Sequence, residues 1–286
     1  MAIRININGK IQKEAFVSAF DHGFLFGDSV YEVINTRKNL PCFLDEHLER
    51  LHSSAKGIEL NIPFDDKWFR KEISQTLVDA ANKESYIRLV VTRGVGDIDI
   101  DPSSCHSPCV LIFVTSARIY RKELYENGIH LAVVNVKRNS KDALNPGIKT
   151  GNYLNNVLAK MEADRLGAND ALMLNLLGQL TESTTSNFFF IQDGRVMTPS
   201  LDCGILPGIT RDIVIRIARE NGYQIEEGRW PIDVLENADE MFLTGTVKQL
   251  MPVTRLDGKN IGDGKPGTIT RSLMHLYENL IEDLDV

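Results

Sequence analysis

The chain has 286 residues, 43% of them hydrophobic, and 39 acidic against 32 basic side chains give it a formal charge of -7. This length can bury a sizeable core, and we expect two domains. The acidic balance, without a long Lys/Arg block, argues against a nucleic-acid partner. No stretch approaches the ~20 apolar residues of a membrane span, and MAIRININGKIQKEAF lacks a targeting pattern, so we expect a cytoplasmic protein without membrane contact.

The first part of the chain predicts a small domain over residues 1–116. Its apolar periods indicate strands and two helices, with Asp45 as the N-cap of the first helix. The expected elements are an edge strand at 4–9, two strands within 29–44, helices at 45–60 and 67–82, and strands at 86–94 and 109–115. Cys105 and Cys109 lack the further ligands of a zinc site, so we expect no metal.

Residues 117–128 lack a clear apolar period and are the predicted connection to a larger domain at 129–286. That domain should hold a strand at 130–138, a helix from about 152 to 166, hairpins at 170–182 and 187–199, a helix at 208–221, a strand at 240–247 and a helical end. Strands mixed with helices in both halves predict an α+β class with mixed sheets.

One lysine, Lys149, lies between a Pro-Gly turn and a glycine in NPGIKTGN. A single lysine is normally a solvated surface residue. A lysine that forms a Schiff base has to be partly desolvated, and a rigid turn before a helix would hold it. The turn alone does not decide between the two readings.

Seven segments in one order resemble the fold-type IV aminotransferases, which use pyridoxal 5'-phosphate (PLP), and among them the branched-chain amino acid aminotransferases. These segments are FGDSVYE, EHLERL, YIRLVVTRG, NPGIKTGNYLNN, GQLTESTTSNFFF, ILPGITR and FLTGT. The resemblance covers nearly the whole chain. It implies the two-domain D-amino-acid aminotransferase-like fold, with a small N-terminal α/β domain, a large C-terminal PLP-binding domain, and a homodimer or higher homo-oligomer.

The resemblance also implies roles for single residues. Lys149 would form the Schiff base with PLP and shuttle the proton between the substrate Cα and the cofactor C4'. Glu182 matches the partner of the pyridine nitrogen, and Tyr153 matches the tyrosine that contacts the phenolic oxygen. The residues that match the phosphate site are Arg50, Ile209, Thr210 and Thr246. Taken singly, each has an ordinary alternative, such as Thr210 as an N-cap or Arg50 as a surface arginine.

Three activities share this scaffold: branched-chain L-amino acid aminotransfer, D-amino-acid aminotransfer and aminodeoxychorismate lysis. The loop after TRG helps to distinguish them. D-amino-acid enzymes carry an arginine and a histidine there, whereas this chain has Asp97, Ile98, Asp99 and Ile100. Branched-chain enzymes show YIR, and the resemblance implies that its arginine receives the side-chain carboxylate of glutamate. The matching pocket residues are Phe26, Tyr31, Tyr86, Arg88, Thr246 and Val247. The ordinary alternative for Arg88 is a strand-edge arginine in a salt bridge.

We therefore expect a PLP-dependent transaminase that exchanges amino groups between branched-chain L-amino acids and 2-oxoglutarate. Two other enzymes stay open, a D-amino-acid aminotransferase and an aminodeoxychorismate lyase. A binding protein that kept the fold and lost the chemistry is a third alternative, and the presence of both Lys149 and Glu182 argues against it.

Overall fold

The computed structural model describes residues 3–284, which form two compact units. The first unit consists of the described residues up to Arg118 together with Ile148–Asn152. The second consists of Ile119–Gly147 and the described residues from Tyr153 onward. The short segment with Lys149 therefore belongs to the first unit, although it lies in the second half of the sequence. Within residues 3–284, no helix has the length and apolar composition needed to cross a membrane.

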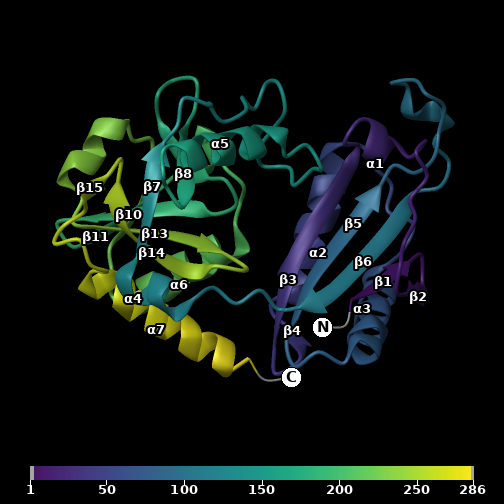
Figure 1. Ribbon diagram of the computed structural model, residues 1–286, viewed down its shortest axis with the longest axis horizontal. Coiled ribbons are helices and arrows are strands. Elements are labelled where there is room, and N and C mark those ends of the chain that lie inside the picture. Colours follow the sequence, from purple (N-terminus) through teal and green to yellow (C-terminus); the bar gives the residue numbers. More distant parts are fainter. Residues whose placement is uncertain (1–2, 285–286) are drawn as a thin grey trace. The chain divides into compact units, whose positions relative to one another are not determined.

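The first unit contains a six-stranded sheet in the order β2-β1-β6-β5-β3-β4, and its pairings are antiparallel (Figure 1). The strands are β1 (Arg4–Ile7), β2 (Lys10–Gln12), β3 (Ser29–Arg37), β4 (Leu40–Pro41), β5 (Ser85–Thr92) and β6 (Cys109–Ser116). The expectation of an edge strand at 4–9 is wrong, because β2 pairs with the outer side of β1.

Helices α2 (Leu44–Gly57) and α3 (Asp66–Ala80) cover one face of this sheet, and α1 (His22–Leu25) is a single turn. Their apolar side chains and those of β3, β5 and β6 form one core. The core includes Val30, Ile34, Leu48, Leu51, Phe69, Ile73, Ile87 and Leu89. The predicted N-cap of α2 is wrong, because Phe43 takes this position. Asp45 lies in the first turn of the helix, where its negative charge interacts favourably with the helix dipole.

The second unit contains a nine-stranded mixed sheet in the order β12-β11-β10-β13-β14-β7-β8-β9, with β15 beside β14 (Figure 1). Because β9 also pairs with β10, six strands close into a ring. The strands are β7 (Ile129–Val133), β8 (Asp170–Leu174), β9 (Leu180–Ser183), β10 (Asn187–Gln192), β11 (Arg195–Pro199), β12 (Ile225–Gly228), β13 (Glu240–Gly245), β14 (Gln249–Leu256) and β15 (Lys259–Asn260).

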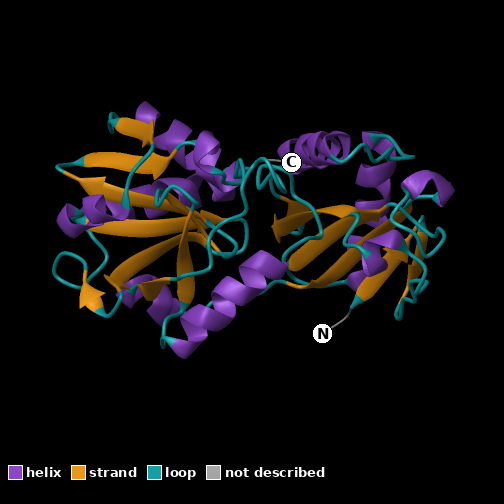
Figure 2. Ribbon diagram, turned by 90° about the horizontal axis from the view of Figure 1, so that it is seen from above, coloured by secondary structure: helices purple, strands orange, loops and turns teal. Residues whose placement is uncertain are grey.

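The pairs β14–β7, β7–β8 and β11–β12 are parallel, and the other pairs are antiparallel. The predicted α+β class is confirmed, with the mixed pattern in this larger sheet. Helices in both units pack against the strands (Figure 2). The helices of the second unit are α4 (Lys122–Asn127), α5 (Leu154–Arg165), α6 (Ile209–Glu220) and α7 (Thr268–Glu282), so the expected connection at 117–128 contains a helix.

Candidate active site

Lys149 is held against strand β3 of the first unit by its backbone. Its carbonyl accepts a hydrogen bond from the Tyr31 amide at 3.0 Å, and its own amide donates to Ser54 Oγ at 3.1 Å. Thr150 forms an isolated bridge with Val30 next to these contacts. The lysine is 9% exposed, so its amine is largely withdrawn from water. This combination of a fixed backbone and a desolvated amine is what a Schiff-base lysine requires.

Two cations lie against the ring of Tyr31. Lys149 Nζ is 4.4 Å and Arg88 Cζ is 4.0 Å from the ring centroid. The register pairs Val33 with Arg88, so Tyr31 and Arg88 share one face of the sheet. Strand β5 lies between β3 and β6, and Arg88 forms no ion pair with any residue among 3–284. The reading of Arg88 as a strand-edge arginine in a salt bridge is therefore wrong.

A buried acid on the opposite face of β3 holds Arg50. Glu32 Oε1 accepts a hydrogen bond from Arg50 Nε at 2.7 Å, and Oε2 accepts one from Arg50 Nη2 at 2.8 Å. His47 Nδ1 lies 2.7 Å from the same Oε2. Arg50, His47 and Ser54 all lie on α2, so one helix positions the arginine and also supports the Lys149 backbone.

These contacts change the titration of the buried groups. Burial alone would raise the pKa of Glu32, but the charge and hydrogen bond of Arg50, with His47, lower that pKa to about 2. Burial also lowers the pKa of His47 below its ordinary value, so this histidine is neutral near pH 7. Glu32 therefore stays ionised and keeps Arg50 in place across the physiological range.

The Glu32 pairing predicts a loss of stability in acid. Because the folded-state pKa lies below the unfolded value of 4.5, the contribution is complete at pH 7 and is lost as the pH falls from about 4.5 towards 2. A shift of this size corresponds to roughly 3 kcal/mol. We expect Glu32→Gln to lower the free energy of unfolding by about that amount at pH 7, and by less than half of it near pH 3. Urea unfolding at several pH values measures the difference, and a constant difference would contradict this account.

Glu182 is the central acid of the second unit. Its Oε1 accepts from Arg138 Nε at 2.9 Å, and its Oε2 accepts from Asn187 Nδ2 at 3.2 Å and from the Leu206 amide at 3.1 Å. The side chains of Arg138 and Glu182 are each 6% exposed. A buried carboxylate with a permanent positive charge and two further donors is held as an anion in a fixed orientation.

The closure of the strand ring places Glu182 in a row of polar side chains. Asn187 is the cross-strand partner of Glu182 and of Thr244, so these three side chains share one face. The start of α6 approaches the same row: a Cβ on Gly208 would lie 1.9 Å from Asn187 Oδ1. Gly208 therefore permits a close approach that any other residue would block.

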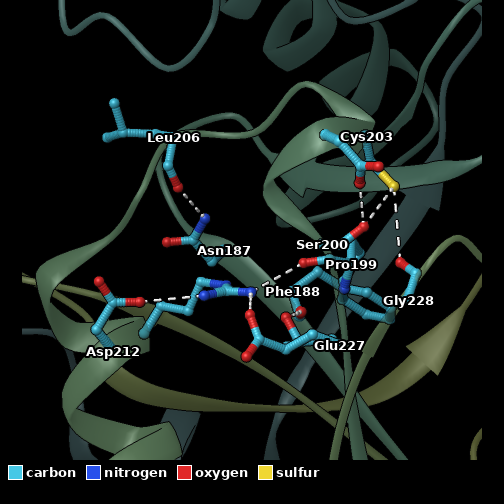
Figure 3. Close-up of polar contacts among 12 residues, drawn as sticks. Asn187, Phe188, Pro199, Ser200, Cys203, Leu206, Asp212, Glu227 and Gly228 are labelled. Carbon is cyan, nitrogen blue, oxygen red and sulfur yellow. Dashed lines mark hydrogen bonds and ion pairs between the residues drawn. The ribbon is translucent and has the colours of Figure 1, made fainter.

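The first turn of α6 is fixed by a buried arginine. The Arg211 guanidinium pairs with Asp212 at 3.1 Å and with Glu227 at 2.7 Å. Asn187 donates to the Leu206 carbonyl at 2.9 Å, and Figure 3 shows these two residues side by side. Gly208 is the N-cap of this helix, so the reading of Thr210 as its N-cap is wrong. The amides at Ile209 and Thr210 are at a helix N-terminus, where the backbone favours an anion such as phosphate.

Other polar groups near this row fit a bound cofactor. Thr246 and Val247 lie in the turn between β13 and β14, directly after Gly245. Within residues 3–284, the buried Oγ atoms of Ser186 and Thr244 have no hydrogen-bond partner. Together with the anionic Glu182 and the α6 amides, these groups suit a ligand that combines a protonated ring nitrogen with a phosphate.

Three further residues predicted from the sequence, Phe26, Tyr86 and Tyr153, lie in the following surroundings. Phe26 is 40% exposed and packs edge-on against His22, with ring centroids 5.0 Å apart. The ring of Tyr86 is 5.2 Å from Arg118 Cζ, and its side chain shares the sheet face of Arg88, two residues along β5. Tyr153 is half-buried at the N-cap position of α5.

The sequence analysis did not identify four residues that support the candidate site: Glu32, His47, Arg138 and Asn187. A signal existed for the first two. Glu32 occupies the apolar face of β3, between Val30 and Ile34, which indicates a buried partner, and EHLERL places His47 and Arg50 three residues apart on one helix face. Arg138 and Asn187 had no comparable signal, because their contacts come from segments far apart in the sequence.

Comparisons with known proteins identify the family. The family model described as Amino-transferase class IV matches residues 29–256. A Methanocaldococcus jannaschii protein described as "Putative branched-chain-amino-acid aminotransferase" is 39% identical over 97% of this chain and 96% of its own length. Aminodeoxychorismate lyase of Bacillus subtilis is 30% identical over 98% and 95% of the two chains. D-alanine aminotransferase of Bacillus licheniformis is 31% identical over 98% and 97%.

Solved structures agree with this match. Branched-chain amino acid aminotransferase of Escherichia coli has a TM-score of 0.94 and 28% identity, covering 98% of this chain and 95% of its own. The branched-chain amino acid aminotransferase of T.th., complexed with N-(5'-phosphopyridoxyl)-L-glutamate, has a TM-score of 0.92 and 31% identity, covering 98% and 94%. The resemblance to the fold-type IV enzymes is confirmed, and the chain belongs to the class IV aminotransferases, which are PLP-dependent enzymes.

Proposed function

We propose that this enzyme exchanges the amino group between the branched-chain L-amino acids leucine, isoleucine and valine and 2-oxoglutarate. In the full reaction the L-amino acid loses its amino group and Cα hydrogen and gains a carbonyl oxygen from water, which makes it a 2-oxo acid. In return, 2-oxoglutarate releases its 2-oxo oxygen as water and gains the amino group and a Cα hydrogen to become L-glutamate. The observation that carries the proposal is Arg88, an arginine on an interior strand that contacts the Tyr31 ring and has no acidic partner within residues 3–284.

Lys149 and Glu182 would carry the chemistry. Bound PLP supplies an electron sink for the electrons of the substrate Cα–H bond. The Lys149 amine anchors the cofactor and then, as a free amine, takes the proton from Cα. Glu182 keeps the pyridine nitrogen protonated, and Arg138 keeps Glu182 ionised and oriented through its 2.9 Å contact.

Arg50, the α6 amides and Thr246 would bind the cofactor phosphate. Arg50 Nε and Nη2 contact Glu32, and this two-point pairing fixes the plane of the guanidinium that would meet the phosphate. Ile209 and Thr210 would contribute amides at a helix N-terminus, and the Thr246 hydroxyl a further donor. Tyr153 would donate to the phenolic oxygen.

The substrate would be held through its two ends. The amides of Thr246 and Val247 would receive the α-carboxylate, which amino acids of every side chain share. Phe26, Tyr31 and Tyr86 would offer aromatic surface to an aliphatic side chain. Arg88 would receive the second carboxylate of glutamate and 2-oxoglutarate, so one site accepts both partners in turn.

The D-amino-acid reading has less support in the 97–101 loop. Asp97, Asp99 and Asp101 provide no cation for a carboxylate, and Asp101 instead caps the short helix η1 (Pro102–Ser104). Ile98 and Ile100 are 72% and 82% exposed. The lyase reading shares Lys149 and the cofactor, and it fits the PGIK turn equally well. Substrate tests therefore have to separate the three activities.

The proposal also covers partners and place of action. We infer a cytoplasmic enzyme whose partners are small amino acids and 2-oxo acids and copies of its own chain, as a homodimer or higher homo-oligomer. Mass measured by light scattering across a concentration series tests the last point.

The substrate prediction concerns Arg88. We expect the PLP form to react faster with L-leucine, L-isoleucine, L-valine and L-glutamate than with D-alanine or D-glutamate, each mixed separately. Arg88→Ala should lower the rate with L-glutamate by at least about 10²-fold and change the rate with L-leucine far less, because glutamate alone would bury a carboxylate without its cation. Stopped-flow absorbance of the cofactor measures each half-reaction.

Arg195→Ala is the matched control, since it removes a half-exposed arginine that pairs with Glu226 on the surface of the second unit. It should leave both rates unchanged. Faster reaction with D-alanine would reject the branched-chain proposal, and equal losses for glutamate and leucine would reject the role of Arg88.

A further inference from the structure

Lys248 follows Thr246 and Val247 in the β13–β14 turn, and its side chain points back into the second unit. Its amine forms an ion pair with Asp170 of β8 and donates to Thr185 Oγ1 at 3.3 Å. The two charged side chains are 11% and 4% exposed. A largely buried ion pair is costly to form unless other hydrogen bonds complete it.

Asp170 has those additional bonds. Its Oδ1 accepts from Thr184 Oγ1 at 2.6 Å and from the Ala171 amide at 2.8 Å, and its Oδ2 accepts from Ser183 Oγ at 3.2 Å. Burial alone would raise the pKa of Asp170, but the charge and hydrogen bond of Lys248, with the bonds from Thr184 and Ala171, hold that pKa below its ordinary value. The carboxylate therefore links the β13–β14 turn to the β9–β10 turn, two loops far apart in the sequence.

The same hydrogen-bond network continues to Glu182, the acid proposed to contact the pyridine nitrogen of the cofactor. Asn156 Nδ2 donates to the Thr184 carbonyl at 2.8 Å, and Asn156 Oδ1 accepts from Arg138 Nη1 at 3.4 Å. Arg138 in turn contacts Glu182. An unbroken series of buried polar contacts thus joins Lys248 to the acid proposed for the pyridine nitrogen.

The β13–β14 turn needs such support. Gly245 pairs with Gln249, so three residues form the connection, and Gln249 adopts a left-handed conformation with a φ of 54°. This conformation is unfavourable for a residue other than glycine. Beyond the Lys248 side chain, the Lys248 carbonyl accepts from the Tyr125 hydroxyl at 3.1 Å. Contacts at Lys248 therefore fix the backbone that presents the Thr246 and Val247 amides.

We propose that Lys248 is a positioning residue for substrate binding: its ion pair with Asp170 holds the Thr246–Val247 amides where they receive the substrate α-carboxylate. This rests on the proposed role of that turn, and it does not depend on which amino acid is the substrate. An α-carboxylate is bound alike in the ground state and the transition state, so the loss should fall on KM rather than on kcat.

The first test is Lys248→Met, which keeps an unbranched side chain that is one atom shorter and removes the charge. We expect the amides of residues 246–249 to exchange hydrogen at least about tenfold faster in the cofactor-free protein, because the turn loses its tether. With the amino acid that the wild type converts fastest, KM should rise about tenfold or more while kcat changes less than about threefold, since weakening a hydrogen bond to a charged carboxylate costs affinity of about that size.

Lys248→Met leaves Asp170 as an unpaired buried charge, so that variant alone could fail to fold. The double variant Lys248→Met/Asp170→Asn removes the charge and keeps an oxygen to accept from Thr184 and Ala171. It should fold and still show the raised KM and the faster exchange. Lys248→Arg keeps the ion pair and should restore KM to within about threefold of the wild type. The control Lys122→Met removes an 86% exposed lysine of α4 and should change nothing.

A folded double variant with the wild-type KM would overturn the proposal, and so would faster exchange without a change in KM. Equal losses with Lys248→Arg and Lys248→Met would also overturn it, because the ion pair would then have no part. A raised KM in an enzyme that prefers D-alanine would support the role of Lys248 and reject only the branched-chain assignment.

Discussion

Lys149→Ala should yield a folded protein that holds no PLP covalently and turns over at least about 10³-fold more slowly, since a positioned acid–base group alone contributes 10²–10⁴-fold. The fold should survive because the contacts to Ser54 and Tyr31 use the Lys149 backbone, and because the variant no longer buries a cation. Borohydride reduction followed by peptide mass spectrometry reports the covalent link, and thermal unfolding reports the fold.

Lys141→Ala provides the matched control, because Lys141 is exposed and precedes the same Pro-Gly turn. It should keep the cofactor link and the turnover of the wild type. Substantial transamination by a pure, folded Lys149→Ala sample would show that another group moves the proton.

Glu182→Gln should retain PLP and lower kcat by about 10²-fold or more, with most of the loss in removal of the Cα proton. A neutral amide cannot hold the proton on the pyridine nitrogen. The amide oxygen can replace only one of the two acceptors that now face Arg138, Asn187 and the Leu206 amide, so a modest loss of stability should accompany the change. Single-turnover rates and a larger Cα-deuterium isotope effect measure the chemical step.

Glu162→Gln makes the same chemical change on α5, at a carboxylate that accepts from the Asn135 amide and side chain at 2.8 Å each. It should leave the isotope effect unchanged. If excess PLP restored the kcat of Glu182→Gln, the acid would serve cofactor binding alone and its proposed chemical role would fail.

Elements with a strong period were predictable from the sequence. The α2 period of Leu48, Leu51 and Ala55 and the alternation along β5 lie within a few residues of the observed bounds. Helix α4 has six residues, and although Leu124 and Tyr125 pack partly buried against the core, the helix is too short to show an apolar period in the sequence. The predicted strand at 130–138 is longer than β7 because apolar residues continue past the end of its pairing.

A local motif singles out Lys149 and Glu182 in the sequence, and the structure shows both side chains to be buried, while their roles stay predictions. The surroundings of Arg88 and Lys248 were not predictable, because they depend on strands and side chains that are far apart in the sequence. Nothing within YIR shows that β5 is an interior strand, and the partner of Lys248 lies 78 residues away in β8. Strand order and buried ion pairs are tertiary properties, so a single sequence does not display them.

The inclusion of Ile148–Asn152 in the first unit has a consequence for inheritance. A gene fragment that ends anywhere between codons 119 and 147 encodes nearly all of the first unit but lacks Lys149. A fragment that begins there encodes Lys149 but lacks strand β3, which holds its backbone. Recombination within this stretch would therefore separate the anchor from its support.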